Sequence, residues 1–178
     1  AEPDAPEGKL ADVGILPVLY FEMQSRPSLK RKVNLGPFTH EVDDGLPLRK
    51  AAISAIDSII ENLPDRVGAS FLVRLREGLG DENADVQLLC HQLLAKLTTR
   101  PAWYAPIVSE LTKLSEVLAE PLKSKTEKKA GRDDVVRSAL RAIDSISRIP
   151  DVAAMRSGPF ASMLKYCRSN EGAAEVQD

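Results

Sequence analysis

Two stretches of this chain are nearly the same: residues 52–59 read Ala-Ile-Ser-Ala-Ile-Asp-Ser-Ile, and residues 139–146 read Ala-Leu-Arg-Ala-Ile-Asp-Ser-Ile. In both, apolar residues recur at steps of three, four and one, which places them in one stripe along a helix. Following the stripe outward predicts a helix over 47–63 and another over 133–149. The near-identity of the two copies indicates that the chain uses one helical unit more than once.

Prolines mark the ends of these helices. In the first helix the stripe runs from Leu48 to Leu63, Pro47 suits the first turn, and Pro64 stops the helix. Pro150 ends the second helix in the same way. The predicted boundaries therefore rest on local signals as well as on the stripe.

A looser copy of the stripe lies between these two and predicts a helix over 84–99. Asp85 can serve near its start and Pro101 ends it, while Asp133 or Asp134 can cap the last copy. A further amphipathic helix fits before each copy, and a short one follows the last. These additional helices are predicted at about 10–24, 67–79, 103–120 and 158–168.

Paired helices at ~40–47 residues per unit are typical of HEAT and armadillo arrays. We therefore predict an all-α fold over residues 10–170: a HEAT-repeat-like α-solenoid of about three helix pairs plus a terminal helix. An ordinary seven-helix bundle is the alternative, because amphipathic helices resemble one another in any fold. A solenoid buries each pair against its neighbours and presents an extended surface to partners.

Residues 29–45 interrupt the helices with Leu-Lys-Arg-Lys-Val-Asn-Leu-Gly-Pro-Phe-Thr-His-Glu-Val-Asp-Asp-Gly. A two-residue turn at Gly36-Pro37 would pair 31–35 with 38–42, with Asp43-Asp44-Gly45 leading into the next helix. Glycine supplies positive φ and proline accepts φ near −65°, which suits a type II′ turn. The segment therefore predicts a β-hairpin at about 30–43.

The two faces of this hairpin differ in character. One face gathers Val33, Leu35, Phe38, His40 and Val42, and the other gathers Lys32, Asn34, Thr39 and Glu41. Because two strands alone are marginal in water, the apolar face must rest on something. It either folds back on neighbouring helices or projects and fills a pocket on a partner, and the residues alone leave both open.

Composition narrows the function classes. The 178 residues are 43% apolar and 28% charged with a net charge of −2, and only 4% are aromatic, which favours helices packed by aliphatic side chains. The charge balance argues against nucleic acid as a partner, and no apolar stretch approaches the ~20 residues of a membrane span. Two cysteines, Cys90 and Cys167, fit a reducing compartment, so we expect the cytoplasm and nucleus.

Catalytic and metal-binding patterns are missing from the sequence. There is no glycine-rich phosphate loop, and His40 and His91 are too far apart in sequence to start a metal site. Cys90 occupies an apolar stripe position, which favours a buried structural thiol. We therefore expect no cofactor, no metal and no enzyme, with an enzyme fragment using His40 and Asp43 or Asp44 as a remote rival.

Besides the hairpin, three segments lie outside the repeat pattern. Residues 1–9 and 171–178 are expected to be disordered, and 121–134 is expected to be a solvated charged loop, although its lysines also fit an anionic-partner or nuclear-import patch. The acidic, Met-less start suggests that the chain is the end of a longer solenoid, or that a separate N-terminal part completes it.

Residues 36–52 read Gly-Pro-Phe-Thr-His-Glu-Val-Asp-Asp-Gly-Leu-Pro-Leu-Arg-Lys-Ala-Ala. They closely resemble the C-terminal domain of the cullin-associated, neddylation-dissociated proteins (the TATA-binding-protein-interacting "120" domain). The shared pattern is Gly-Pro-Phe-x-His-x-Val-Asp-Asp-Gly-Leu-x-Leu/Ile-Arg-Lys-Ala-Ala. Weaker matches at 16–20, 120–122 and 137–142 extend the resemblance over roughly residues 15–150.

The resemblance implies a HEAT solenoid that binds cullins lacking the ubiquitin-like modifier and exchanges the substrate receptors of cullin–RING ubiquitin ligases. Its C-terminal part would engage the cullin N-terminal region, with a protruding β-hairpin where the receptor's adaptor docks. This favours projection of the hairpin over folding back. The partner-binding residues would then be Lys30, Arg31, Lys32, Val33, Leu35, Gly36, Pro37, Phe38, Thr39, His40 and Val42.

These residues suggest a mechanism of competition. The apolar face would fill the adaptor groove, with Phe38 and Leu35 as its hot spot, and Lys30, Arg31 and Lys32 would add electrostatic steering. Because adaptor and hairpin would share a site, each would lower the other's affinity. The alternative is a generic HEAT scaffold, or a transport or assembly factor, that binds partners through the solenoid surface.

Overall fold

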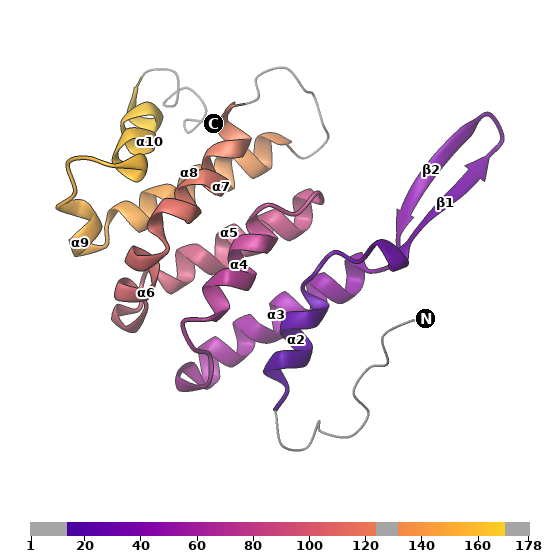
Figure 1. Ribbon diagram of the computed structural model, residues 1–178, viewed down its shortest axis with the longest axis horizontal. Coiled ribbons are helices and arrows are strands. Elements are labelled where there is room, and N and C mark those ends of the chain that lie inside the picture. The colour runs from indigo at the N-terminus through magenta and orange to yellow at the C-terminus, as the bar shows by residue number, and fades with distance from the viewer. Residues whose placement is uncertain (1–13, 124–131, 170–178) are drawn as a thin grey trace. The chain divides into compact units, whose positions relative to one another are not determined.

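The computed structural model describes residues 14–123 and 132–169. The chain forms two compact units, and the boundary between them follows Gly68. The sequence predicts one domain over residues 10–170. In a repeat array each helix pair packs on its neighbours, so compact units can form within one array. Figure 1 shows the elements of both units.

The first unit contains one helix pair and the hairpin. Its elements are α2 (Leu16–Glu22), a 3-10 turn η1 (Pro27–Leu29), β1 (Lys30–Leu35), β2 (Phe38–Asp43), α3 (Leu46–Asn62) and a 3-10 turn η2 (Pro64–Arg66). Helix α2 packs on α3, which makes them the predicted pair, and β1 and β2 form the two-stranded sheet. Helix α2 is shorter than the predicted 10–24 within the described residues.

The buried face of α3 differs from the predicted stripe. Pro47 lies in the first turn and the helix ends before Pro64, as predicted. However, Leu48 and Leu63 are 45% and 56% exposed. The buried residues are Arg49, Ala52, Ile53, Ile56 and Ile60. The stripe is rotated by about one residue and includes an arginine, because a paired guanidinium can occupy a place that an apolar side chain would otherwise take.

The second unit contains the remaining helices. Its elements are α4 (Phe71–Leu79), α5 (Ala84–Leu97), η3 (Pro101–Trp103), α6 (Tyr104–Ser109), α7 (Leu111–Lys123), α8 (Arg132–Ser147), α9 (Pro150–Ala153) and α10 (Pro159–Arg168). Helix α4 packs on α5, and α7 packs on α8. The second helices of these two pairs, α5 and α8, pack on each other, and α10 packs on α7 and α8. This stacking confirms the HEAT-like all-α fold with a terminal helix.

Aliphatic side chains dominate the core of the second unit. The fully buried residues include Leu75, Leu94, Leu114 and Ile146. The rings of Phe71 and Trp103 pack edge to face, with their centroids 6.4 Å apart. This agrees with the low aromatic content of the sequence. Among the described residues, no helix is long and apolar enough to span a bilayer.

Several helix ends depart from their predicted positions. Asn83, not Asp85, caps α5, since the Asn83 side chain accepts a hydrogen bond of 3.0 Å from the Asp85 backbone N–H. Asp133 and Asp134 lie inside the first turn of α8, where acidic side chains favour the helix dipole. Pro150, which was predicted to end a helix, also begins the short helix α9.

The predicted helix 103–120 is divided in two. The break falls at Glu110, between α6 and α7, and the Glu110 carboxylate accepts a hydrogen bond of 2.7 Å from Arg76 of α4. The predicted loop 121–134 is helical at both ends, because α7 runs through Pro121 to Lys123 and α8 begins at Arg132. Residues 124–131 and the predicted disordered flanks lie outside the described residues.

Candidate protein-interaction hairpin

Strands β1 and β2 pair in the predicted register. Leu35 faces Phe38, Val33 faces His40 and Arg31 faces Val42 on one side of the sheet. Gly36 has a φ of +68°, and a Cβ placed there would meet no atom within 4 Å. Glycine is therefore required by the backbone conformation of the turn rather than by lack of space.

The hairpin is exposed over most of its length and extends away from α2 and α3 (Figure 1). The Phe38 side chain, beside the turn, is 68% exposed. Exposure continues along β2 through Glu41, and only Val42 and Asp43 at its end are half-buried. The hairpin thus projects from the helix pair and does not fold back on it.

An ion pair fixes the end of β2 to the start of α3. The Arg49 guanidinium, 1% exposed, donates a hydrogen bond of 2.8 Å to the Asp43 carboxylate. This hydrogen bond from Arg49 is the main reason that the pKa of Asp43 is lowered from its ordinary value. The second Asp43 oxygen accepts a hydrogen bond of 2.9 Å from the Gly45 backbone N–H. Asp43 therefore joins the hairpin to a buried point in the helix pair.

A second set of contacts ties β1 to the same place. Arg31 donates to the Asp44 carboxylate at 2.7 Å, and the Asp44 backbone N–H donates to the Leu29 carbonyl at 2.9 Å. A Cβ at Gly45 would lie 3.0 Å from the Leu29 side chain. Together with the Asp43–Arg49 pair, these contacts form the base clamp of the hairpin, made by Leu29, Arg31, Asp43, Asp44, Gly45 and Arg49.

The other face of the hairpin is polar. The Thr39 hydroxyl donates a hydrogen bond of 2.9 Å to the Asn34 side chain, and Lys32 lies directly opposite Glu41. Lys30, half-buried, lies opposite Asp43. Residues 30–44 carry three Lys or Arg and three Asp or Glu side chains, so the hairpin has no basic excess.

The predicted site residues are therefore gathered on one element. Gly36, Pro37, Phe38, Thr39 and His40 are exposed at and beside the turn. Val33 and Val42 are half-buried, and Leu35 is placed opposite Phe38 by the strand pairing. The arrangement presents an exposed aromatic side chain on the same face as aliphatic residues, which suits contact with another protein.

His40 and Asp43, two residues of the rival enzyme site, lie apart. His40 pairs across the sheet with Val33, whereas Asp43 pairs with Lys30, which puts His40 and Asp43 on opposite faces of the hairpin. Asp43 and Asp44 are engaged by Arg49 and Arg31. His40 and Asp43 therefore do not form an acid–base pair on the hairpin.

The other two candidate reactive residues are in the core. Cys90 is buried on α5, as predicted, and burial raises the pKa of its thiol to about 12. His91 is also buried, and burial lowers the pKa of its imidazole to about 4. Neither group is accessible in a reactive form near neutral pH. Among the described residues, no three His, Cys, Asp or Glu side chains form a possible metal set.

Sequence reasoning missed the role of Arg49. It lies among the residues that carry the family resemblance, yet it was assigned no function. The available signal was its spacing, because Arg49 stands four residues before Ile53 and seven before Ile56, on the face that α3 buries. A buried arginine requires a carboxylate partner, and Asp43 is an acid just before the helix.

Known proteins resemble this chain in sequence. The family described as "TATA-binding protein interacting (TIP20)" matches residues 11–168. Cullin-associated NEDD8-dissociated protein 1 of Dictyostelium discoideum is 38% identical over 143 residues, which is 76% of this chain and 11% of that protein. The Arabidopsis thaliana protein of the same name is 36% identical over 159 residues, 85% of this chain and 13% of its own length.

A second member of the group is similar to the same extent. Cullin-associated NEDD8-dissociated protein 2 of Mus musculus is 34% identical over 165 residues, 88% of this chain. The chain spans only 11% to 13% of the length of these three relatives. The family match and these identities show that the chain belongs to the cullin-associated NEDD8-dissociated protein family and carries its TATA-binding protein interacting domain.

Proposed function

We propose that this chain is a cullin-binding module of a substrate-receptor exchange factor, and that its hairpin occupies the place on the cullin N-terminal region where the receptor's adaptor docks. The observation that carries the proposal is the 68% exposure of Phe38 on a hairpin whose base is clamped. Large exposed aromatic side chains on ordered elements are typical of binding hot spots. The names of the relatives supply the cullin as the partner.

A hairpin that already has its bound conformation before it meets the partner binds more tightly. The base clamp and the strand pairing hold the hairpin in one conformation, so association loses less conformational entropy than it would for a free loop. Phe38 would enter an apolar pocket, with Val33 and Leu35 beside it. The polar face of Thr39 and Asn34 would remain towards solvent or the rim of the interface.

Electrostatic steering contributes less to this proposal than the sequence suggested. Arg31 is paired with Asp44, while Lys30 and Lys32 lie opposite acids across the sheet. The local charges therefore cancel at short range, and we expect weak salt dependence for the hairpin contact.

Exchange follows from a shared site. If hairpin and adaptor exclude each other on the cullin, binding of either lowers the affinity for the other by the same factor. The proposed partner is the cullin without its ubiquitin-like modifier, and the proposed compartments are the cytoplasm and nucleus. No catalytic step by this chain is required.

The test is adaptor displacement from an unmodified cullin, measured by fluorescence with labelled adaptor. One variant replaces residues 31–42 by Gly-Gly and so retains Asp43 for Arg49. A second is Phe38→Ala. We expect the first to abolish displacement and the second to weaken it by about 2 kcal/mol, roughly thirtyfold.

Asn34→Ala is the matched control, because Asn34 is exposed near the turn but lies on the other face of the hairpin from Phe38. It should displace the adaptor nearly as well as the unchanged chain. If the Gly-Gly variant displaced the adaptor as efficiently as the intact chain, the hairpin mechanism would be wrong. Cullin binding retained by that variant would then favour contact through the helical surface.

A further inference from the structure

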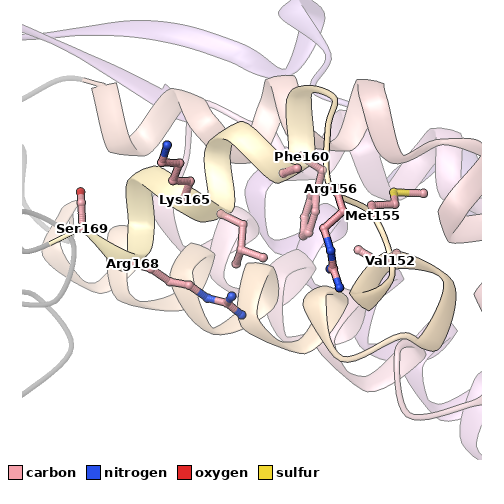
Figure 2. A pocket seen from close by; sticks show the side chains of 9 residues that line it. Val152, Met155, Arg156, Phe160, Lys165, Arg168 and Ser169 are labelled. Carbon is pink, nitrogen blue, oxygen red and sulfur yellow. The ribbon is translucent and has the colours of Figure 1, made fainter.

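A second surface feature lies at the end of the second unit and has no part in the hairpin proposal. A groove of about 510 Å³ is formed by α9, α10 and the segment between them. Figure 2 shows the side chains that line it. Its lining includes Val152 of α9, Met155 and Arg156 of the connecting segment, and Phe160 and Arg168 of α10. The groove therefore follows one side of α10 from its first turn to its last.

The floor of the groove is apolar. Val152 and Phe160 are each 3% exposed, and Leu164 is half-buried one turn further along α10. Met155 is 37% exposed and borders the same space. A ligand that lay here would cover aliphatic, aromatic and thioether surface, and burial of that apolar surface favours binding.

The rim of the groove is basic. Arg156, Lys165 and Arg168 line it, and no acidic residue does among those described. Within the described chain, none of these three cations forms a salt bridge, and the Arg156 guanidinium donates to the Ala153 carbonyl at 3.1 Å. Figure 2 shows Arg156 and Arg168 towards the two ends of the groove.

This cluster of positive charge differs from the ion-paired cations at the end of α8. Two cations of α8 and its end, Arg137 and Arg148, are instead paired with carboxylates three and four residues before them. Lys165 and Arg168 lie in the last turn of α10, where the helix dipole favours cations, but Arg156 precedes that helix and gains nothing from it. The dipole therefore does not account for the whole rim.

We propose that this groove binds a short acidic peptide of another protein, one that carries bulky apolar side chains between its Asp and Glu residues. Arginines flanking an apolar floor match both parts of such a peptide: carboxylates on the rim and Leu, Phe or Met side chains on the floor. Nucleic acid fits less well, because three cations on a chain of net charge −2 provide little phosphate neutralisation and a phosphate backbone leaves the floor uncovered.

The test begins with selection of 12-residue peptides from a random display library on the full 178-residue chain. Affinities of the selected peptides are then measured by fluorescence polarisation. We expect the peptides to be enriched in Asp and Glu interleaved with large apolar residues. Arg156→Glu/Arg168→Glu should weaken their binding by about tenfold or more, and Met155→Ser/Leu164→Ser should weaken it severalfold.

Arg66→Glu/Arg141→Glu is the matched control for charge. Both residues are exposed, neither lines the groove, and the net charge changes by the same amount. This control and the Gly-Gly hairpin variant should bind the peptides with unchanged affinity. Thermal unfolding of every variant separates loss of binding from loss of fold.

Four outcomes would overturn the proposal. Selected peptides without acidic enrichment, or with affinity unchanged by Arg156→Glu/Arg168→Glu, would show that the groove is not their site. Affinity unaffected by Met155→Ser/Leu164→Ser would reduce the groove to a charged patch. Tighter peptide binding by a chain shortened to residues 1–169 would identify residues 170–178 as the occupant instead of another protein.

Discussion

The hairpin and the α5–α8 pair are held by different forces. Helices α5 and α8 bury Leu94, Leu97 and Ile146 completely, so their arrangement depends on apolar burial. The hairpin exposes most of its side chains, and its shape depends on backbone pairing, a glycine turn and the base clamp. Residues on the hairpin are thus available for binding at little cost to the fold, whereas residues in the helix pair are committed to stability.

The largest effect on stability is expected from a cavity in the helix pair. Leu94→Ala removes a fully buried side chain of α5 and should lower the free energy of unfolding by about 3 kcal/mol. Denaturant unfolding gives the magnitude, and hydrogen exchange should show the loss in residues 69–123. Loss below about 1 kcal/mol would mean that the core around α5 can collapse onto the space.

Acid should weaken the same core through His91. Because the pKa falls from 6.5 to about 4 on folding, the unfolded chain binds the proton first and stability decreases as the pH falls through this range. The loss is on the order of 3 kcal/mol between pH 7 and pH 4.

His91→Leu should remove that component of the pH dependence. Since neither ring nitrogen of His91 has a hydrogen-bond partner among the described residues, the variant should be at least as stable at pH 7. Parallel stability–pH curves for the two proteins from pH 7 to pH 4 would contradict the prediction.

The base clamp should show an intermediate effect. Asp43→Asn removes the carboxylate that Arg49 donates to and should destabilise the first unit by about 2 kcal/mol, measured by denaturant unfolding at pH 7. Since Arg49 lowers the pKa of Asp43, this stabilisation is present above the unfolded pKa and lost as the pH falls below about 4.

Asp44→Asn provides the comparison for the clamp. It breaks the Arg31–Asp44 pair, in which both side chains are about half exposed, and such pairs contribute little to stability. Equal destabilisation by Asp43→Asn and Asp44→Asn would show that burial of Arg49 does not set the strength of the clamp.

The smallest effect on stability is expected at the hairpin tip. Phe38→Ala should change the free energy of unfolding by less than about 0.5 kcal/mol, because the side chain is mostly exposed. The same variant should show a large loss in the displacement assay described above. A large stability loss from Phe38→Ala would place the ring in the fold rather than in an interface.

The hairpin was predictable almost to the residue because its signals are local. Alternation of side chains sets the pairing of Leu35 with Phe38, and Gly36-Pro37 selects the turn. The paired helices were also predictable, since the 3.6-residue period and the prolines do not depend on distant contacts. Only part of the base clamp could be predicted. The sequence places Asp43 and Gly45 at the end of the hairpin, but it does not identify Arg49 as the partner of Asp43.

The predictions were wrong where a contact with another element determines which residues are buried or where a helix ends. The stripe of α3 is rotated so that Arg49 is buried, and the break between α6 and α7 lies at Glu110, which reaches Arg76 of another helix. The groove along α10 could not be inferred either, since Met155, Arg156 and Leu164 share it only after α9 and α10 fold.

The sequence by itself determined the helix pairs, the hairpin and its register, and the family to which the chain belongs, because periodicity, turn residues and motif residues act over a few positions. Only the tertiary structure decided that the hairpin projects, that Arg49 is buried against Asp43, and that cations gather around an apolar groove at α10. The physical reason is that burial and charge pairing depend on which surfaces meet, and periodicity along one element does not specify its neighbour.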